Sequence, residues 1–355
     1  MINLSCTNCN SKNIIKKGLK ENKFQVIQRY KCKNCEKYFT LQNSKNTTYP
    51  IAIIIKGISL YNLGYSLKEV SNLISKEKKI NISTISLWVN KYKPLTSYNK
   101  LRKQAIKLYN PKEIIFKKQL RHKQVYLFKY HKAKLKILPR LNKNLPLRFI
   151  ERLTKYLEKI QTDKFPHHIF NKEIKKEEQR SSKLKFKTLN FVKLSKNNYA
   201  NKLAKIALKS AKNNYQRHQK IQDFMLANDT STIATEIPVY LTKYDIKYFI
   251  ERDFKLNLEN QETPITGHID ILQLRNNLIH ILDYKPDADK INPINQLTIY
   301  ALSLASRLQI PIKCFKAAWF DDKNYFEFFP LHAVYNKKIN KTKNFNNILI
   351  TRVLA

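Results

Sequence analysis

Glycine is scarce in this sequence, with four residues in 355. So few glycines leave no room for the glycine-rich loops that cradle nucleotide phosphates, and we expect no small-molecule cofactor. Long apolar runs are missing too, since Ile51–Ile55 is far shorter than the ~20 residues of a membrane-spanning helix. The first residues, MINLSCTNCN, lack the charged and apolar regions of a signal peptide. We therefore expect a cytoplasmic protein with no membrane partner.

Acidic residues are also few, with 26 Asp and Glu against 68 Lys and Arg, a net charge of +42. Residues 1–230 hold 52 basic and 13 acidic residues, whereas residues 231–355 hold 16 and 13. Drift toward lysine in an AT-rich genome would not explain an excess that stops near residue 230. Because phosphates neutralised by basic residues release counterions, we expect the first part to bind DNA. An anionic membrane surface is the weaker alternative, since no basic amphipathic helix stands out.

Cysteine is limited to five residues, four of which form two pairs of equal spacing. Cys6 and Cys9 form one C-x-x-C pair, and Cys32 and Cys35 form the other after 22 residues. Two such pairs supply the four thiolates of a closed, structural zinc site. The alternatives are iron on the same ligands or cysteines paired by chance. We expect a zinc ribbon over residues 1–48 in a reducing compartment.

Residues 49–98 favour three short helices. Ser66 and Glu69 form a capping box for the second helix, and Ser83 is expected to cap the third. Apolar positions expected to face the core are Val70, Leu73, Ile74, Ile85 and Val89. Outward positions of the third helix, which would face a DNA major groove, are Thr84, Ser86, Asn90 and Lys91. A plain three-helix packing unit would fit the same pattern.

Residues 99–198 are dense in Lys and Arg and match no recognisable fold. The stretch Val125–Lys129 is strand-like, Leu147–Ile160 is helix-like, and Lys172–Arg180 is a charge run. We expect a basic connecting region.

Residues 199–355 read as an α/β domain. The apolar pattern predicts a long helix from Tyr199 to about Ala227, followed by strands and one further helix. The strands are expected near 232–241, 265–274, 278–284, 312–320 and 325–331, and the helix near 293–308. The whole chain is thus expected to be a multidomain α+β protein, with a mixed sheet flanked by helices at its end.

The strongest chemistry lies between residues 265 and 300. Asp270 ends one predicted strand, and Asp283 and Lys285 stand two apart on the next, on one face. A turn near Asn276 and Asn277 would bring Asp270 beside Asp283. Two carboxylates bordered by an amine suit Mg²⁺ or Mn²⁺ holding phosphate oxygens. A surface ion-pair cluster is the alternative, but burying an acid after an apolar run is costly without a role.

This stretch resembles the RecB and Cas4 branch of the PD-(D/E)XK nucleases, over roughly residues 199–331. The branch carries G-x-x-D, D-Y-K and Q-x-x-x-Y. The matching residues here are Gly267 with Asp270, Asp283-Tyr284-Lys285, and Gln296 with Tyr300. The resemblance implies a metal-dependent deoxyribonuclease in which Gln296 and Tyr300 contact DNA or brace the site.

The same resemblance implies a histidine metal ligand on the first helix, for which His218 is the candidate. An exposed helical histidine without a role is the alternative. Glu236 either assists the site or only begins a strand. Many relatives hold an iron–sulfur cluster near the nuclease core, but Cys314 is the only cysteine after residue 35, so we expect none here.

The stretches KNIIKKG and QRYKCKNCEKYFT around the cysteines resemble the zinc ribbons of insertion-sequence transposases. Residues 61–93 resemble the helix-turn-helix of transposases and resolvases. The resemblance implies that residues 1–48 and 49–98 hold DNA. We interpret the chain as a DNA-binding nuclease of a mobile element or of a DNA repair or defence system. The alternative is a non-catalytic DNA-binding regulator or transposition accessory protein with a nuclease-like fold. A transposase proper would need three spaced acids on an RNase H-like fold, which we do not find. Exonuclease or endonuclease action and the oligomeric state stay open.

Overall fold

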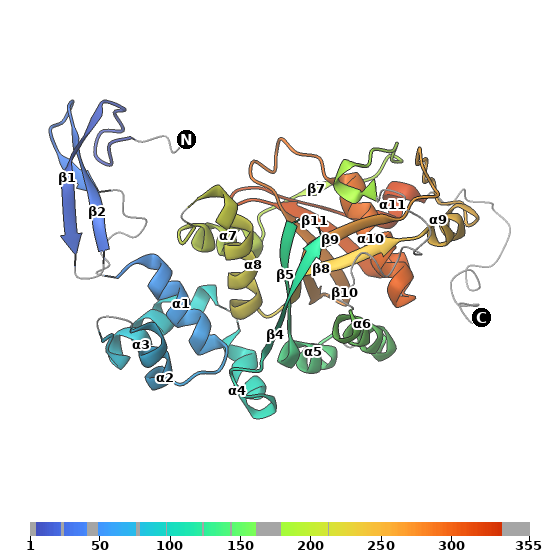
Figure 1. Cartoon of the computed structure of the whole chain (residues 1–355), viewed down its shortest axis with the longest axis horizontal. Coiled ribbons are helices and arrows are strands. Elements are labelled where there is room, and N and C mark those ends of the chain that lie inside the picture. The colour runs from blue at the N-terminus through green and yellow to red at the C-terminus, as the bar shows by residue number, and fades with distance from the viewer. Residues whose placement is uncertain are drawn as a thin grey trace.

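The computed structural model describes residues 5–22, 25–40, 49–75, 79–96, 98–122, 124–142, 144–160, 179–211 and 213–335. These residues form a mixed α+β structure with a small sheet and a large one (Figure 1). The small sheet has three strands, and the large sheet has nine. None of the described helices is both long and apolar enough to cross a membrane.

The small sheet belongs to the N-terminal ribbon. Its antiparallel strands are β1 (Ile14–Asn22), β2 (Gln25–Cys32) and β3 (Tyr38–Thr40). The pairing of β1 with β2 shifts between Lys16 and Leu19, and Gly18 between them has a φ of 71°. Glycine tolerates this left-handed conformation without steric cost, so the bulge is compatible with the strand.

Three helices follow, as the sequence predicts: α1 (Ile51–Asn62), α2 (Leu67–Ile74) and α3 (Ile82–Tyr92). The capping box of Ser66 and Glu69 is present in full. The predicted cap at Ser83 is wrong, because α3 begins earlier: the Ile85 N–H already bonds the Asn81 carbonyl. Leu73 was also placed wrongly, since it is 46% exposed. It lies at the edge of the narrow stripe that α2 buries.

These helices are docked on the rest of the chain. Their apolar side chains share one buried cluster with α7 (Tyr199–Leu208) and α8 (Arg217–Asn228). Asn62 donates to the Asn228 amide oxygen at 2.8 Å, and Asn228 donates to the Ser59 hydroxyl at 2.8 Å. The Arg102 guanidinium bonds three carbonyls at the end of α1, those of Tyr61, Gly64 and Tyr65. The three helices and α8 therefore form one packed unit.

The large sheet runs in the order β4-β5-β8-β9-β10-β11-β12-β7, with β6 paired to β9. Its strands are β4 (Ile115–His122), β5 (Gln124–His131), β6 (Gln179–Arg180), β7 (Leu194–Ser195), β8 (Thr232–Leu241), β9 (Ile265–Arg275), β10 (Leu278–Tyr284), β11 (Phe315–Phe320) and β12 (Tyr325–Phe328). The β6–β9 and β10–β11 pairs are parallel and the others antiparallel. The sheet is therefore mixed, as expected.

The remaining helices surround this sheet (Figure 1). They are α4 (Asn99–Leu108), α5 (Lys132–Ile137), α6 (Leu147–Lys159), α9 (Lys243–Ile250), α10 (Ile294–Leu308) and α11 (Pro330–Val334). The last two strands, predicted at 312–320 and 325–331, are shorter in the structure. Residues 312–314 form a 3-10 turn before β11, and Pro330 begins α11 after β12.

The long helix predicted from Tyr199 to Ala227 is wrong, because the structure has two helices there. α7 ends at Leu208, and the Asn213 side chain accepts the Gln216 N–H to begin a new turn before α8. This side-chain acceptor competes with a continuous helix. The break places His218 in the first turn of α8.

Residues 99–198 are not a separate connecting region, and the boundary expected at residue 199 does not follow the sheet. β5 pairs with β8, where Lys129 lies opposite Thr235, so β4 and β5 extend the large sheet. β6 pairs with β9, and β7 pairs with β12. The strand at Val125–Lys129 was predicted. It pairs with β4, directly before it, and on its other side with β8, about a hundred residues later in the chain. Most of the charge run Lys172–Arg180 falls outside the described residues.

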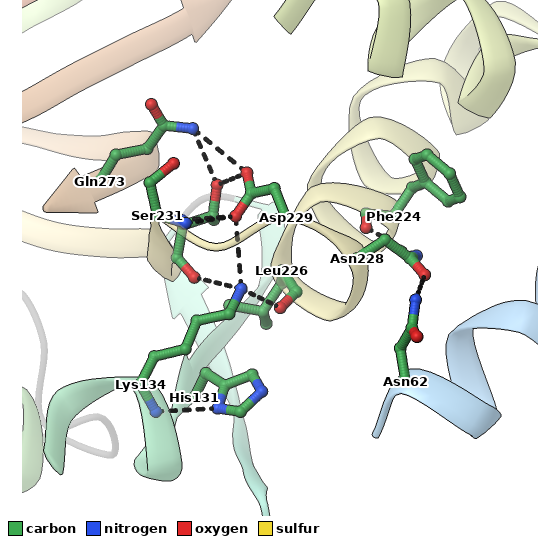
Figure 2. A network of polar contacts seen from close by, with 10 residues as sticks. Asn62, His131, Lys134, Phe224, Leu226, Asn228, Asp229, Ser231 and Gln273 are labelled. Carbon is green, nitrogen blue, oxygen red and sulfur yellow. Dashed lines mark hydrogen bonds and ion pairs between the residues drawn. The ribbon is translucent and has the colours of Figure 1, made fainter. Parts of the chain in front are cut away.

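A buried polar network joins α5, α8 and β8 (Figure 2). The fully buried Lys134 ammonium donates to the Leu226 carbonyl at 2.7 Å and the Thr232 carbonyl at 2.9 Å. It also lies 3.3 Å from the Asp229 carboxylate, which accepts the Ser231 N–H. Every donor of the ammonium thus has an acceptor, which makes its burial tolerable.

Removing the carboxylate should destabilise the fold strongly. In Asp229→Ala, the buried Lys134 ammonium loses its counter-ion, and the Ser231 and Thr232 N–H groups lose their acceptor. We therefore expect a loss of about 3–5 kcal/mol in the free energy of unfolding. Chemical denaturation measures it. The control is Glu251→Ala, which removes the exposed partner of Lys247 and should cost under about 0.5 kcal/mol. Equal losses in the two variants would contradict this role of the network.

Candidate functional site

The four paired cysteines converge at one end of the ribbon. Cys6 Sγ lies 3.6 Å from Cys35 Sγ, and Cys9 Sγ lies 3.6 Å from Cys32 Sγ. All four sulfur atoms lie within 4.8 Å of one another. Zn–S bonds of about 2.3 Å in a tetrahedron would separate the sulfurs by about 3.8 Å, so the spacing fits zinc. The cluster could hold a metal ion such as zinc.

The backbone of the two turns places N–H groups close to the cysteine sulfur atoms. Asn10 and Glu36, each four residues after the first cysteine of a pair, have a left-handed φ of 57°. The backbone N–H groups of Cys35 and Asn34 lower the pKa of the Cys32 thiol to about 6. Since metal ions bind the thiolate form, these turns favour binding.

We expect one zinc ion per chain at this cluster. Elemental analysis of the purified protein should find about one zinc, and Cys6→Ser with Cys9→Ser should lose it, because two ligands do not hold the ion. Cys314→Ser is the control and should keep the metal. Stoichiometric iron with visible charge-transfer absorption would show that the site is not zinc.

Three carboxylates meet on three neighbouring strands of the large sheet. Ile271 of β9 lies opposite Leu282 of β10 and opposite Thr235 of β8. Because both pairs are antiparallel, the next position along β9, Asp270, lies between Asp283 of β10 and Glu236 of β8. The predicted turn at Asn276 and Asn277 makes this possible, with φ values of 52° and 59° suited to a tight hairpin.

Helix α8 supplies polar partners to two of these carboxylates. His218 Nδ1 lies 3.2 Å from Asp270 Oδ2, and Gln222 Nε2 donates to Glu236 Oε1 at 2.6 Å. His218 and Gln222 are four residues apart, so they lie on one face of the helix. Sequence reasoning found His218 but missed Gln222, for which this spacing was the available signal.

Lys285 is the partner of the third carboxylate. Its ammonium lies 2.9 Å from Asp283 Oδ2, and the Asp283 residue is 1% exposed. The Lys285 N–H bonds the Phe320 carbonyl at 3.0 Å, which continues the pairing beyond the end of β10. The predicted association of Asp270, Asp283 and Lys285 is therefore present.

The carboxylates cannot all be ionised easily in this arrangement. Burial raises the pKa of Asp283 well above its ordinary value, and the charge of Asp270 raises it further. Burial also raises the pKa of Glu236 to about 8, again with Asp270 contributing. Burial opposes ionisation of Asp270 as well. The hydrogen bond and charge of His218, the hydrogen bond with Asp283 and the charge of Lys285 together outweigh burial and hold the Asp270 pKa at about 2. A cation would relieve this repulsion.

The same side chains do not converge on one point as the cysteines do. Among the described residues, the four cysteines are the only group of three or more Cys, His, Asp or Glu with ligand atoms all within 4.8 Å. The side chains of the carboxylate cluster instead make separate contacts: His218 with Asp270, Gln222 with Glu236, and Lys285 with Asp283.

The backbone at Glu236 is strained. Its φ is 54°, in the left-handed region, although Thr235 and Ile237 on either side remain paired with β9. A non-glycine residue in such a conformation costs roughly 1–3 kcal/mol and is found where the surroundings fix it. Glu236 lies within β8 rather than at its start, and its side chain accepts the hydrogen bond from Gln222.

Gln296 and Tyr300 lie on α10 and contact each other. Gln296 Nε2 donates to the Tyr300 hydroxyl at 2.8 Å, and Tyr300 is buried against β9. A Cβ at Gly267 would lie 2.4 Å from Tyr300 Cε1 and 2.4 Å from Ser181 Oγ. Only glycine lets the α10 tyrosine approach the strand this closely, three residues before Asp270.

Gly267→Ala should therefore destabilise the protein by roughly 1–3 kcal/mol, because the new methyl group displaces Tyr300. Thermal unfolding measures the change. The matched control is Gly57→Ala in α1, whose Cβ would lie 3.4 Å from Trp88 and should change stability by no more than about 1 kcal/mol. An unchanged melting temperature in Gly267→Ala would show that α10 does not need this close approach.

The proposed DNA-reading positions on α3 differ in exposure. Asn90 and Lys91 are exposed, Thr84 and Ser86 are half-buried, and Ile85 and Val89 are buried as predicted. Of the four polar positions, Asn90 and Lys91 are the most accessible to a partner.

Comparison of this chain with protein-family models, with curated proteins and with solved structures finds no match.

Proposed function

We propose that this chain is a DNA-binding, metal-dependent nuclease. The observation that carries the proposal is the alignment of Glu236, Asp270 and Asp283 on adjacent strands, with Lys285 on Asp283 and His218 on Asp270. Buried acids of like charge, bordered by an amine, are costly to a fold and common at catalytic sites. The resemblance of the motif residues to PD-(D/E)XK nucleases agrees with this reading.

The donor set suits a hard divalent cation. The carboxylates of Asp270 and Asp283 would hold Mg²⁺ or Mn²⁺, with the His218 imidazole as a further ligand. Bound there, the ion would polarise the scissile phosphate and lower the pKa of a bound water. Glu236, with a pKa of about 8, is positioned to give up its proton as positive charge enters the site.

The other residues would position these groups. Gln222 holds Glu236, and Lys285 would offset charge on the phosphate oxygens or orient the attacking water. Gln296 and Tyr300 would brace the strand that carries Asp270. DNA would be held by the basic first part of the chain, with Asn90 and Lys91 of α3 facing the groove.

Single substitutions should separate metal binding from chemistry. Asp270→Ala and Asp283→Ala should abolish cleavage of end-labelled DNA in Mg²⁺ or Mn²⁺, because each removes a ligand. Lys285→Ala should keep metal and DNA binding while the rate falls roughly 10²–10³-fold, as for a lost transition-state contact. Cleavage and DNA-binding assays on the same proteins test both statements.

Asp289→Ala and Lys290→Ala are matched controls, since both residues are exposed in the loop after the site. They should cleave like the parent. If Asp283→Ala and Lys285→Ala also cleave at the parental rate, the site assignment is wrong. If the parent binds DNA but never cleaves it, the chain is a DNA-binding regulator.

A further inference from the structure

A hollow lies between α6, the end of α10 and the edge of β8. Its volume is about 410 Å³, within the usual range of small-ligand sites. β5 pairs with β8 only at Ala234 and Thr235, so this pairing stops where the hollow begins. At the uncovered edge the Tyr156 hydroxyl donates to the Pro238 carbonyl at 2.7 Å.

Among the described residues that line the hollow, four are cations and none is Asp or Glu. They are Arg152, Lys155 and Lys159 of α6 and Arg307 of α10. The three α6 residues are exposed and recur at helical spacing, so they form one basic face of that helix. Such a row of like charges is unfavourable by itself and favours an anion.

Partners for these cations are few. Arg307 pairs with Asp245, and Arg152 donates to the Gln309 carbonyl at 2.7 Å, a neutral acceptor. In the part of the chain that the structure describes, Lys155 and Lys159 have no ion-pair partner. The two lysines are therefore free to bind an anionic ligand at the mouth of the hollow.

The rest of the lining is apolar or aromatic. Pro238, Ile160 and Leu308 line it, and the Tyr240 ring has the Arg307 guanidinium 4.4 Å from its centroid. A bare inorganic anion would leave this surface unused. A ligand with a flat apolar body and a charged end would use both the apolar lining and the lysines.

We propose that this hollow binds a nucleoside phosphate, with the phosphate on Lys155 and Lys159 and the base against the apolar lining. The ligand is either a free nucleotide or one nucleotide of a nucleic-acid strand. Pro238 stands two residues along β8 from Glu236, so a strand held here would pass close to the carboxylate cluster. Binding at the hollow does not depend on cleavage.

Binding of fluorescently labelled pTpT to the full chain in EDTA tests the proposal, because cleavage is then absent. Lys155→Ala with Lys159→Ala should weaken binding at least about tenfold through loss of two charge-assisted contacts. The control is Lys103→Ala with Lys107→Ala, an equally spaced exposed pair on α4. It should change the affinity less than about twofold, since it alters only the screened net charge.

Competition identifies the source of the ligand. Unlabelled pTpT competing better than dTMP would indicate a strand, and equal competition would indicate a free nucleotide; both support the site. Inorganic phosphate competing as well as dTMP would overturn it, because the apolar lining would then contribute nothing. Equal affinities of the two double variants would also overturn it.

Discussion

The packing of three carboxylates on adjacent strands is the constraint on which the large sheet depends. Asp270 lies between Glu236 and Asp283, and burial makes full ionisation of all three unfavourable. The chain opposes this repulsion with His218, Gln222 and Lys285. Two of these partners come from α8, so the position of that helix decides whether the strands can hold their acids.

Helix α8 is fixed at its other end as well. Asn228 forms hydrogen bonds with Asn62 and Ser59 of α1. The adjoining Asp229 accepts a hydrogen bond from the buried Lys134 ammonium. One helix thus joins the three-helix unit, the buried polar network and the carboxylate cluster. If α3 holds DNA as proposed, the recognition helix and the proposed catalytic centre belong to one packed body. Cleavage would then occur at a defined distance from the bound sequence.

Local features were predictable where one or two residues determine them. The cysteine pairs, the Ser66 capping box and the Asn276–Asn277 turn each follow from short-range chemistry, and the turn was enough to place Asp270 beside Asp283. Features that depend on distant partners were not predictable. The membership of β4 and β5 in the sheet rests on pairing across about a hundred residues.

Other features that the sequence did not predict have local causes. Asn213 interrupts what the apolar periodicity predicts as one helix, because its side chain offers the backbone another acceptor. Gln222 carries no charge and belongs to no motif, so its spacing of four residues from His218 was the one signal for its contact with Glu236. The left-handed backbone at Glu236 is likewise set by its surroundings, since glutamate has no preference for it.

In the proposed nuclease, the carboxylates of Asp270 and Asp283 bind a divalent cation. Titrating Mn²⁺ into the zinc-loaded protein by calorimetry, in buffers of different ionisation enthalpy at pH 7, tests it most directly. The raised pKa values of Asp283 and Glu236 predict that binding releases protons, and that Asp270→Asn loses both the binding and the release. Mn²⁺ binding that is absent, or that persists unchanged in Asp270→Asn, would contradict the claim.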